Sequence, residues 1–458
     1  MALDGDRVIH LDRVLERQQL HSAASKVRPV FGRVRSQSLR GPALNRPGGD
    51  RLRTLQQIIE NAYGYTRAEG AKLYRRAPSA GGLYPTEVVC VVLIAARWTA
   101  LTYDFHRRVF RELLDSEPAT IATACAVTAD QAVIVVTSTL WRTLQRYGFR
   151  GYRYCLIDAG IVMGTIAQVC RAEQRSLTHL DNRALTQIDD WLALPSSEIT
   201  ACAAIIDCAG ARSTEVGHRD APLLPRAPDT AWQQSPMLAA ELERTIRLDR
   251  AMRVAEAPDR ALVSAGGASE DRAELQHLID TRRSARGLRR GELDAQACGW
   301  LPRALDAIVS QWPARHRDSI ALTLAVRADR PLLRAMRRTA SRIDVTAVDD
   351  LPDRALTALF GGQALMAEAD LFFVAGLRGD VAEDAIAVFR SSLLQIGMLT
   401  STVQLLAVQS GIAHTIVGGF DDAALAAMSG HTITPLVAIA FGTAATHSTK
   451  NDTPRRQS

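Results

Sequence analysis

The sequence predicts an α+β fold that occurs twice in one chain, with mixed sheets flanked by helices. A long, largely apolar segment begins at Tyr154, and a segment of similar pattern begins 237 residues later at Ser391. Both are apolar on most faces, which predicts two buried helices. Strand-like runs flank each helix, at 131–140 and 199–210 around the first and at 369–377 and 433–442 around the second. The repeated order indicates an internal repeat, and the scarcity of regular β-α-β alternation favours α+β.

A length of 458 residues suits two domains better than one. Chance similarity between two apolar helices is the alternative to a repeat, and the matching order of four elements weighs against it. Residues 209–236 are rich in Pro, Gly, Ser and charge, and a charged helix is predicted over 237–254. We therefore expect an N-terminal domain over 1–210, a linker with a charged helix over 211–270 and a C-terminal domain over 271–458.

Composition excludes several classes of protein. The formal charge is +6 and the charges are mixed along the chain, so nucleic-acid binding is not predicted. Seven cysteines without a C-x-x-C pair indicate neither a disulfide framework nor a metal site. The N-terminus is charged where a signal peptide is apolar, and the longest apolar run, Val88–Ala96, is too short to span a membrane. A cytoplasmic protein without a membrane segment is expected.

The run RRAPSAGGLYP at 75–85 is the most informative local pattern. Ser79 can cap a helix or donate to a ligand oxygen, and the small residues at 80–82 let backbone approach a flat ring or a phosphate closely. A plain turn is the alternative, since proline and glycine punctuate loops. The chain has no G-x-G-x-x-G, Walker or G-x-S-x-G motif, so a dinucleotide fold, an NTPase and a serine hydrolase are unsupported.

Residues 75–92 resemble the flavin-binding signature of the SagB/ThcOx-type dehydrogenases, a branch of the FMN-dependent nitroreductase family. Other segments resemble motifs of that family in the same order: HSAASK at 21–26, AYGYT at 62–66, TYDFHRR at 102–108 and RYGFRGYRYCLIDAG at 146–160. The second half resembles the general nitroreductase pattern more weakly. The resemblance implies a nitroreductase-like fold present twice, as a fused pseudodimer, with FMN as cofactor.

In the family that the sequence resembles, one subunit supplies a Pro-Ser loop beside the flavin ring and the other an arginine-rich segment for the phosphate. The residues implied to bind the cofactor are Arg76, Pro78, Ser79, Ala80, Gly81 and Gly82 in the first half, and Arg282, Arg283, Ser284, Arg286, Gly418 and Gly419 in the second. Alternate residues of an extended segment point the same way, so Arg282, Ser284 and Arg286 are expected to converge on one ligand. A solvated surface is the alternative, because arginine is abundant throughout the chain. Each half lacks the motifs of the other, which predicts one complete FMN site per chain.

Tyr147 and Arg146 are the expected catalytic residues, because the family has Lys-Tyr where this chain has Arg146-Tyr147. An arginine keeps its proton at working pH, so Arg146 is expected to position substrate or to stabilise negative charge. Tyr147 can exchange a proton if Arg146 or Arg150 lowers its pKa. A packed aromatic with a satisfied hydroxyl is the alternative for Tyr147.

The resemblance implies an FMN-dependent dehydrogenase that oxidises thiazoline or oxazoline rings to thiazoles or oxazoles in a ribosomally synthesised peptide. A modified precursor peptide is the implied substrate and a cyclodehydratase the implied partner, and the pseudodimer is expected to be monomeric or to associate further. One alternative is a flavin reductase that uses NAD(P)H to reduce an activated double bond or a nitro group, which Arg146 in place of lysine favours. A second is a non-catalytic structural subunit of a peptide-modifying complex.

Overall fold

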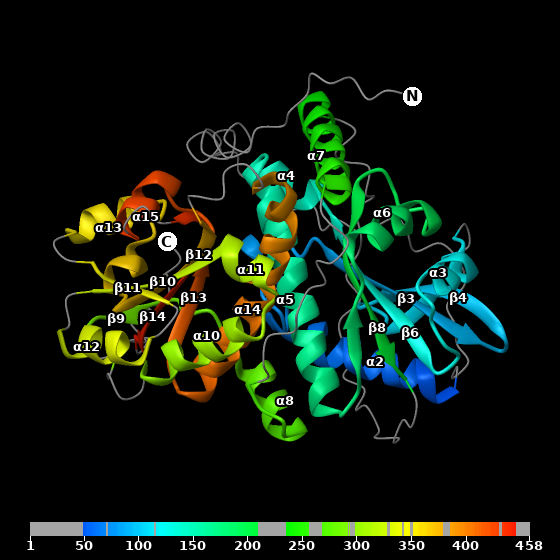
Figure 1. The fold of residues 1–458 in the computed structure, drawn as a ribbon, viewed down its shortest axis with the longest axis horizontal. Helices are drawn as coiled ribbons and strands as arrows, with labels where there is room; N and C mark the ends of the chain where they lie inside the picture. The colour runs from blue at the N-terminus through cyan, green and yellow to red at the C-terminus, as the bar shows by residue number, and fades with distance from the viewer. Residues whose placement is uncertain are drawn as a thin grey trace, which may run out of the picture.

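In a computed structural model, two sheets lie on either side of a central pair of long helices (Figure 1). The structure describes residues 49–69, 72–113, 116–208, 235–255, 268–291, 293, 298–327, 330–340, 343–348, 351–378, 385–429 and 433–445. The family-like segment HSAASK at 21–26 and most of the expected linker, 211–234 and 256–267, lie outside the described residues.

Each half contains a six-stranded sheet. The first has the order β5-β4-β3-β6-β8-β7 and is antiparallel throughout. The second has the order β11-β10-β12-β14-β13, with β9 paired to β14; β10 and β11 are parallel and the other pairs antiparallel. Strands β6, β8, β10 and β12 are buried almost throughout, which explains why their sequences are largely continuous apolar runs. The strands are β3 (Thr86–Ile94), β4 (Arg97–Asp104), β5 (Val109–Glu112), β6 (Gln131–Thr139), β7 (Leu177–His179), β8 (Glu198–Asp207), β9 (Leu288–Arg289), β10 (Ile320–Val326), β11 (Asp344–Ala347), β12 (Leu371–Arg378), β13 (Ala413–Val417) and β14 (Ile433–Ala444).

A separate hairpin of β1 (Tyr65–Glu69) and β2 (Lys72–Arg75) precedes the first sheet. The α-helices are α2 (Gly49–Tyr63), α3 (Pro118–Ala124), α4 (Trp141–Tyr147), α5 (Arg150–Ala172), α6 (Asn182–Trp191), α7 (Pro236–Ala255), α8 (Arg272–Thr281), α10 (Trp300–Ser310), α11 (Ala314–Ser319), α12 (Arg330–Thr339), α13 (Asp353–Leu359), α14 (Ala385–Gln409) and α15 (Asp422–Met428). The described residues also form two 3-10 turns, η1 (Ala80–Gly82) and η3 (Ala364–Glu368).

Four strands in each sheet repeat the same connections. The neighbours β3-β6-β8-β7 in the first sheet correspond in order to β10-β12-β14-β13 in the second. The long helix α5 joins β6 to β7, as α14 joins β12 to β13. A bulge interrupts the ladder at the same place in both sheets, at Ala201 of β8 and at Leu436 of β14. The predicted order of strand, long helix, short helix and strand therefore occurs twice.

Helices α5 and α14 make backbone contact at two glycines. A Cβ built on Gly160 would collide with the carbonyl oxygen of Leu394, and one built on Gly397 would collide with the carbonyl oxygen of Ile157. The two contacts are reciprocal: Gly397 lies 237 positions after Gly160, and Leu394 lies 237 positions after Ile157. Glycine, which has no Cβ, permits this separation. The two contacts fix the position of one helix along the other.

The charged helix predicted over 237–254 is α7, and one of its faces is buried against α4, α6 and α14. Asp249 of α7 accepts hydrogen bonds from Tyr152 of α5 at 2.7 Å and from Arg390 of α14 at 2.9 Å, and pairs with Arg253 one turn later at 2.6 Å. Burial raises the pKa of Asp249, but the charges of Arg253 and Arg390 outweigh burial and hold it below its usual value. Helix α7 therefore joins α5 to α14 through one buried carboxylate.

Helices α5 and α14 are long and apolar enough to cross a membrane, with a mean hydropathy of 1.4 over their most apolar stretches. Within each stretch 89% is buried inside the protein. The core helices of globular proteins share this property, so length and composition are here weak evidence for a span.

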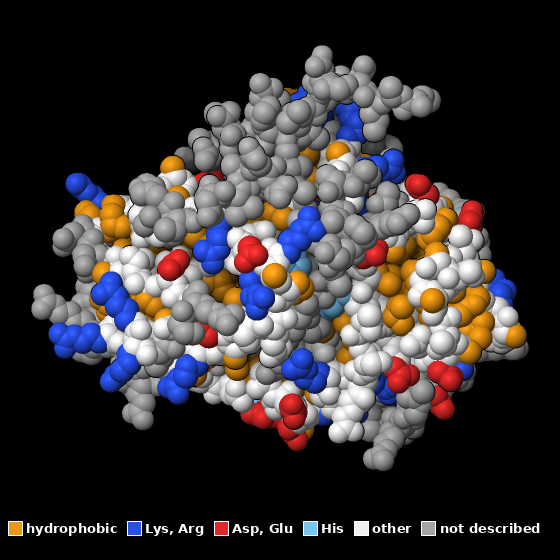
Figure 2. Space-filling view, in the orientation of Figure 1, with side chains coloured by type: hydrophobic (Ala, Val, Ile, Leu, Met, Phe, Trp, Pro, Cys, Tyr) orange, Lys and Arg blue, Asp and Glu red, His pale blue; other side chains and the backbone are white. Residues whose placement is uncertain are grey.

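On the face shown in Figure 2, positive and negative side chains are interspersed.

Replacing Gly160 with alanine should push α5 and α14 apart, because the colliding atom belongs to the backbone. Overpacking a buried contact costs about 1–3 kcal/mol or more, and we expect this as a lower free energy of unfolding in urea titration. Gly442→Ala is the matched control, because its Cβ would meet the Cβ of Leu288 at an ordinary 3.4 Å. Equal stability of the two variants would contradict the helix contact.

Candidate functional site

The run at 75–85 forms a loop between β2 and β3 that contains η1. Gly81 and Gly82 have φ angles of 62° and 64°, in the left-handed region that favours glycine. The backbone N–H of Tyr84 donates to Oγ of Ser79 at 2.9 Å, which closes the loop. Gly81 is exposed, and Pro78, Ser79, Ala80 and Gly82 are half-buried.

Gly81 lies against both expected catalytic side chains. A Cβ built on it would stand 2.5 Å from the hydroxyl oxygen of Tyr147 and 3.0 Å from Nη1 of Arg146. The ring of Tyr147 meets the ring of Tyr154 edge-on, with 4.9 Å between centroids. The guanidinium carbon of Arg146 lies 5.3 Å from the Tyr147 centroid. The loop and the pair at the end of α4 therefore form one continuous surface.

Burial raises the pKa of Tyr147, and the charge of Arg146 opposes this increase without reversing it. The condition stated for proton exchange, a pKa lowered below its ordinary value, is therefore not met, because desolvation of the phenolate outweighs the attraction. Arg150 is engaged elsewhere, since it pairs with Asp422 at 2.8 Å. At neutral pH the hydroxyl of Tyr147 carries its proton and can donate it to a reacting atom.

The second half reaches this surface through the turn Gly418–Gly419. Tyr154 donates its hydroxyl proton to the carbonyl oxygen of Gly418 at 2.6 Å, and Arg150 donates to the same oxygen at 3.1 Å. A Cβ on Gly418 would stand 2.5 Å from the ring of Tyr154, so a side chain does not fit there. Gly419 is exposed, and no atom lies within 4 Å of its Cβ position.

A buried charge cluster holds this turn against α5. Asp422, the first residue of α15, pairs with Arg150 at 2.8 Å and with Arg153 at 3.3 Å. Arg153 also donates to the carbonyl oxygen of Pro435 in β14 at 3.0 Å. Because a paired and hydrogen-bonded buried charge resists displacement, the turn from the second half is fixed beside the first-half tyrosines.

Arg282, just after α8, is a buried cation for which the described residues supply no carboxylate partner. Its Nε donates to the carbonyl oxygen of Arg76 at 3.2 Å, and its Nη1 is 3.5 Å from the side-chain oxygen of Gln404. Burial lowers the pKa of Arg282 to about 10. A charge removed from water without compensation is unfavourable, so an anionic ligand group fits beside this guanidinium.

Arg75 is also buried, but its surroundings differ. Its guanidinium carbon lies 4.1 Å from the ring centroid of Phe105 and 4.4 Å from that of Tyr63, with Tyr65 and Tyr84 within 6 Å. Aromatic faces stabilise a cation electrostatically. The charge of Arg75 is therefore compensated by rings, and it supports the loop rather than a ligand.

The convergence expected for alternate residues of the arginine-rich segment is not seen. Arg282 is buried, whereas Ser284 and Arg286 are exposed. Arg283 is exposed as well and donates to the backbone carbonyl oxygens of Asp280 and Arg282. The segment leaves a helix end instead of forming a regular strand, so strand alternation does not apply to it.

Arg76 is directed away from an incoming ligand. Its Nε pairs with Asp280 of α8 at 2.6 Å, and its Nη1 donates to the carbonyl oxygen of Glu60 in α2 at 2.5 Å. Its own carbonyl oxygen accepts from Arg282. Arg76 therefore joins the loop of the first half to the arginine-rich segment of the second.

Asp158 is a functional candidate that the sequence analysis does not name. It stands in the middle of α5, is 4% exposed, and lies beneath the loop with its two carboxylate oxygens 3.3 and 3.2 Å from the backbone nitrogen of Ala80. Ser79 also hydrogen-bonds to it. The signal for Asp158 in the sequence is a lone acidic residue inside an apolar helix of 23 residues.

These residues fit a flavin mononucleotide in two respects. The buried guanidinium of Arg282 suits a phosphate, and the small residues at 79–82 and 418–419 leave backbone beside an exposed surface where a flat ring can lie. Contacts run without a break from Arg282 through Arg76 and the loop to Tyr147, Tyr154 and the turn at 418–419. The candidate site therefore contains residues from both halves.

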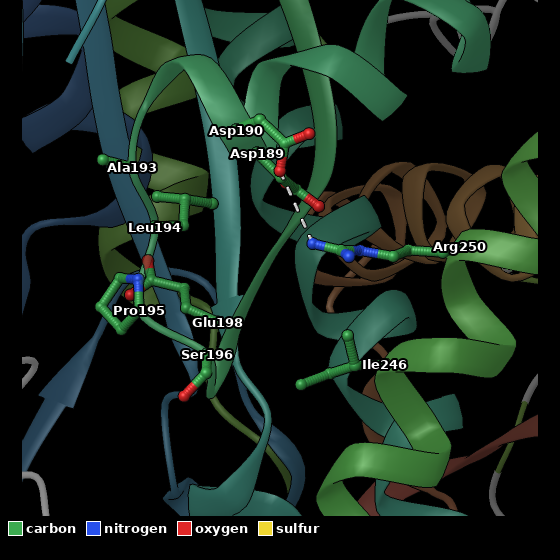
Figure 3. A pocket seen from close by; sticks show the side chains of 9 residues that line it. All are labelled: Asp189, Asp190, Ala193, Leu194, Pro195, Ser196, Glu198, Ile246 and Arg250. Carbon is green, nitrogen blue, oxygen red and sulfur yellow. Dashed lines mark ion pairs between the residues drawn. The ribbon is translucent and has the colours of Figure 1, made fainter.

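A separate pocket of about 240 Å³ lies between α6, the start of β8 and α7 (Figure 3). Arg250 of α7 pairs with Asp190 across it at 3.7 Å. Its Asp189 is already paired with Arg253 at 2.9 Å and accepts from the backbone N–H of Thr200. The pocket contains none of the residues implied to bind flavin, and we do not assign the site to it.

Arg282→Leu should affect stability and ligand binding in opposite directions. Removing the uncompensated cation should leave the ligand-free protein as stable or more stable, measured by urea unfolding. Loss of a buried charged partner should weaken FMN binding by about 2–5 kcal/mol, measured by flavin fluorescence quenching. Arg97→Leu is the control, because that side chain is exposed and pairs with Glu112 in the first sheet. Equal FMN affinity in the two variants would place the phosphate elsewhere.

Comparison with known proteins supports the fold. No family model matches the chain. A solved nitroreductase structure from Anabaena variabilis aligns with a TM-score of 0.66 at 19% identity, covering 95% of this chain and 99% of that chain. A curated nitroreductase of Methanocaldococcus jannaschii is 29% identical over 118 residues, 24% of this chain, so the chain spans 58% of the length of that relative. The E. coli microcin synthetase McbBCD complex with truncated pro-MccB17 matches at a TM-score of 0.30 and 16% identity, over 45% of this chain and 84% of that chain, too low to carry an argument. The chain thus has an α+β nitroreductase-like fold.

Proposed function

We propose that this chain is an FMN-dependent oxidoreductase with one flavin site, built from both halves. The observation that carries the proposal is a buried Arg282, with no carboxylate partner in the described part of the chain, next to a glycine loop that touches Tyr147 and Arg146. Arg282 would hold the phosphate through charge-assisted hydrogen bonds. The residues at 79–82 and 418–419 would border the ring.

We infer further that the two halves, over 1–210 and 271–458, are a fused pseudodimer. The repeated strand order and the reciprocal glycine contacts support this inference. So do Arg153 and Arg390, which are 237 residues apart and each donate to a strand of the opposite half. Arg153 reaches the carbonyl oxygen of Pro435 at 3.0 Å and Arg390 that of Thr200 at 2.8 Å, next to the matching bulges. On this view each half has kept a different part of one site.

In the proposed reaction, a thiazoline or oxazoline ring of a ribosomally made peptide loses one hydrogen as hydride and one as a proton, which gives a thiazole or oxazole. FMN, when bound, supplies the hydride acceptor. Arg146 would hold the peptide, because a guanidinium does not accept the proton. Tyr147 accepts a proton only as phenolate, so its raised pKa predicts oxidation that accelerates with pH. A cyclodehydratase that makes the azoline is the proposed partner.

A second candidate is a reductase that uses NAD(P)H to reduce an activated double bond or a nitro group. The raised pKa of Tyr147 favours this candidate, because a reduction at neutral pH needs a proton donor. Arg146 in place of lysine points the same way. A non-catalytic subunit of a peptide-modifying complex is the third candidate, and it would bind no flavin.

Flavin loading and bleaching separate these candidates. We expect purified protein loaded with FMN and freed of excess to release about one FMN per chain on heating. A ratio near two would contradict the shared site, and no bound flavin would favour the non-catalytic subunit. Under anaerobic conditions, bleaching of the bound flavin by an azoline peptide supports the dehydrogenase, whereas bleaching by NAD(P)H supports the reductase.

Tyr147→Phe should keep the ring that packs on Tyr154 and remove the acid–base oxygen. Flavin content should be unchanged, while turnover should fall by about 10²–10⁴-fold. If the dehydrogenase is correct, the native rate should rise with pH in the alkaline range and the variant rate should not. Tyr65→Phe is the control, because its hydroxyl contacts His106 at 3.1 Å, away from α4. A near-native rate for Tyr147→Phe would show that this tyrosine only packs.

A further inference from the structure

Asp158 and Ser79 form a hydrogen-bonded pair beneath the loop. Both oxygens of the Asp158 carboxylate lie within 3.3 Å of the backbone nitrogen of Ala80, and Ser79 bonds to the same carboxylate. Oγ of Ser79 also accepts the backbone N–H of Tyr84 at 2.9 Å. The side chain of Ser79 thus lies between a buried carboxyl group and the open side of the loop.

A hydroxyl group has one proton and two lone pairs. When Asp158 is ionised, it can only accept, so the proton of Ser79 is directed inward to the carboxylate. Oγ can then act only as an acceptor toward a ligand. When Asp158 is protonated, the carboxyl group can donate to Oγ, and the proton of Ser79 is free to point outward. The charge state of Asp158 therefore determines whether Ser79 donates to a ligand.

The ionisation of Asp158 falls in the neutral range. Burial raises its pKa to about 7, against the opposing hydrogen bonds from Ser79 and Ala80. The contacts of Asp158 recorded for the described residues include no cation. Among the described residues, no neighbouring positive charge therefore lowers the pKa of Asp158.

The other titratable groups around Asp158 stay in one form across this range. Burial raises the pKa of each neutral neighbour: Tyr63 of α2, Tyr84 of the loop, Tyr147 of α4 and Cys155 of α5. The charged groups beside these neighbours are Arg75, Arg146, Arg282, and Glu87 paired with Arg142 at 2.8 Å. Arginines keep their charge across this range. A response of the loop between pH 6 and 8 is therefore assigned to Asp158.

We propose that Asp158 is a positioning residue that controls, through the hydroxyl of Ser79, whether the loop donates a hydrogen bond to the bound flavin. This inference rests on the proposed function. The carbonyl edge of a flavin ring accepts hydrogen bonds, and the FMN phosphate is an anion. Protonated Asp158 favours binding on both counts, because Ser79 then donates and a negative charge is removed from the site. FMN should bind more tightly below pH 6 than above pH 8.

The test compares FMN affinity by fluorescence quenching from pH 5.5 to 8.5 in native protein, Asp158→Asn and Ser79→Ala. Asparagine resembles the protonated acid, since it donates to Ser79 and accepts from Ala80. One neutral hydrogen bond corresponds to about a five- to tenfold change in Kd. Relative to Asp158→Asn, we expect native protein to bind FMN more weakly by that factor as the pH is raised. Ser79→Ala should show a smaller weakening, because it keeps only the effect of the carboxylate charge. Asp130→Asn, a change at an exposed carboxylate, should keep the native profile.

A second readout uses the protein without flavin. A carboxyl group whose pKa is higher in the folded than in the unfolded state destabilises the fold increasingly as pH rises from about 4 to about 7. The Tm of Asp158→Asn should therefore exceed the native Tm at pH 8, and the difference should shrink toward pH 5. Ser79→Ala retains the carboxyl group, so its Tm should still fall as the pH rises, while its FMN affinity should depend less on pH than the native affinity does.

The outcomes separate this inference from the proposed function. Native FMN affinity that depends on pH no differently from the affinity of Asp158→Asn overturns the inference and leaves the flavin site standing. A native pH dependence that persists undiminished in Ser79→Ala overturns it as well. Absence of FMN binding to native protein at every pH overturns the proposed function, and the inference with it.

Discussion

Reciprocal backbone contacts at Gly160 and Gly397 set the distance between α5 and α14, and the rest of the structure is built around this distance. Helix α5 is buried along nearly its whole length, and the described part of α14 is buried as well. Neither helix keeps a face for water, so separating the halves would expose a large apolar area. The site depends on the same contact. Helix α5 carries Tyr154 and Asp158, whereas the turn at Gly418, which contacts Tyr154, belongs to the second half. A shift between the helices would move these residues relative to that turn.

The buried arginines differ in what compensates their charge, and this difference locates the candidate site. Arg150 and Arg153 share Asp422, and Arg253 and Arg390 share Asp249. The first cluster fixes the turn beside α5, and the second joins α7 to α5 and α14. Arg282 is buried without such a carboxylate in the described part of the chain. Because an uncompensated buried charge lowers stability, its position beside the loop is better explained by an anionic ligand than by folding.

Two titratable groups lie next to the loop, Tyr147 beside Gly81 and Asp158 beside Ala80. Tyr147 stays protonated through neutral pH because burial raises its pKa, whereas burial brings the pKa of Asp158 to about 7. Arg146 stands where the resembled family has lysine, and it cannot exchange protons. On the proposed function, proton exchange beside the loop would depend on Tyr147, and on the further inference Asp158 would set the hydrogen bonds that the loop offers. The same arrangement suits proton donation by Tyr147 at neutral pH and proton acceptance by its phenolate at alkaline pH.

The sequence by itself determined the elements and the location of the loop. Apolar runs and their period predict α5, α14, α7 and the core strands, because these patterns follow from local geometry and burial. The glycines at 81 and 82 mark the loop, since their backbone angles disfavour other residues. Only the tertiary structure decided that Asp158 contacts Ala80, 78 residues away, that Arg282 is buried while Arg286 is exposed, and that burial raises the pKa of Tyr147. Burial and charge compensation depend on contacts between groups that are distant in the chain. The spacing of residues along the sequence does not indicate these contacts.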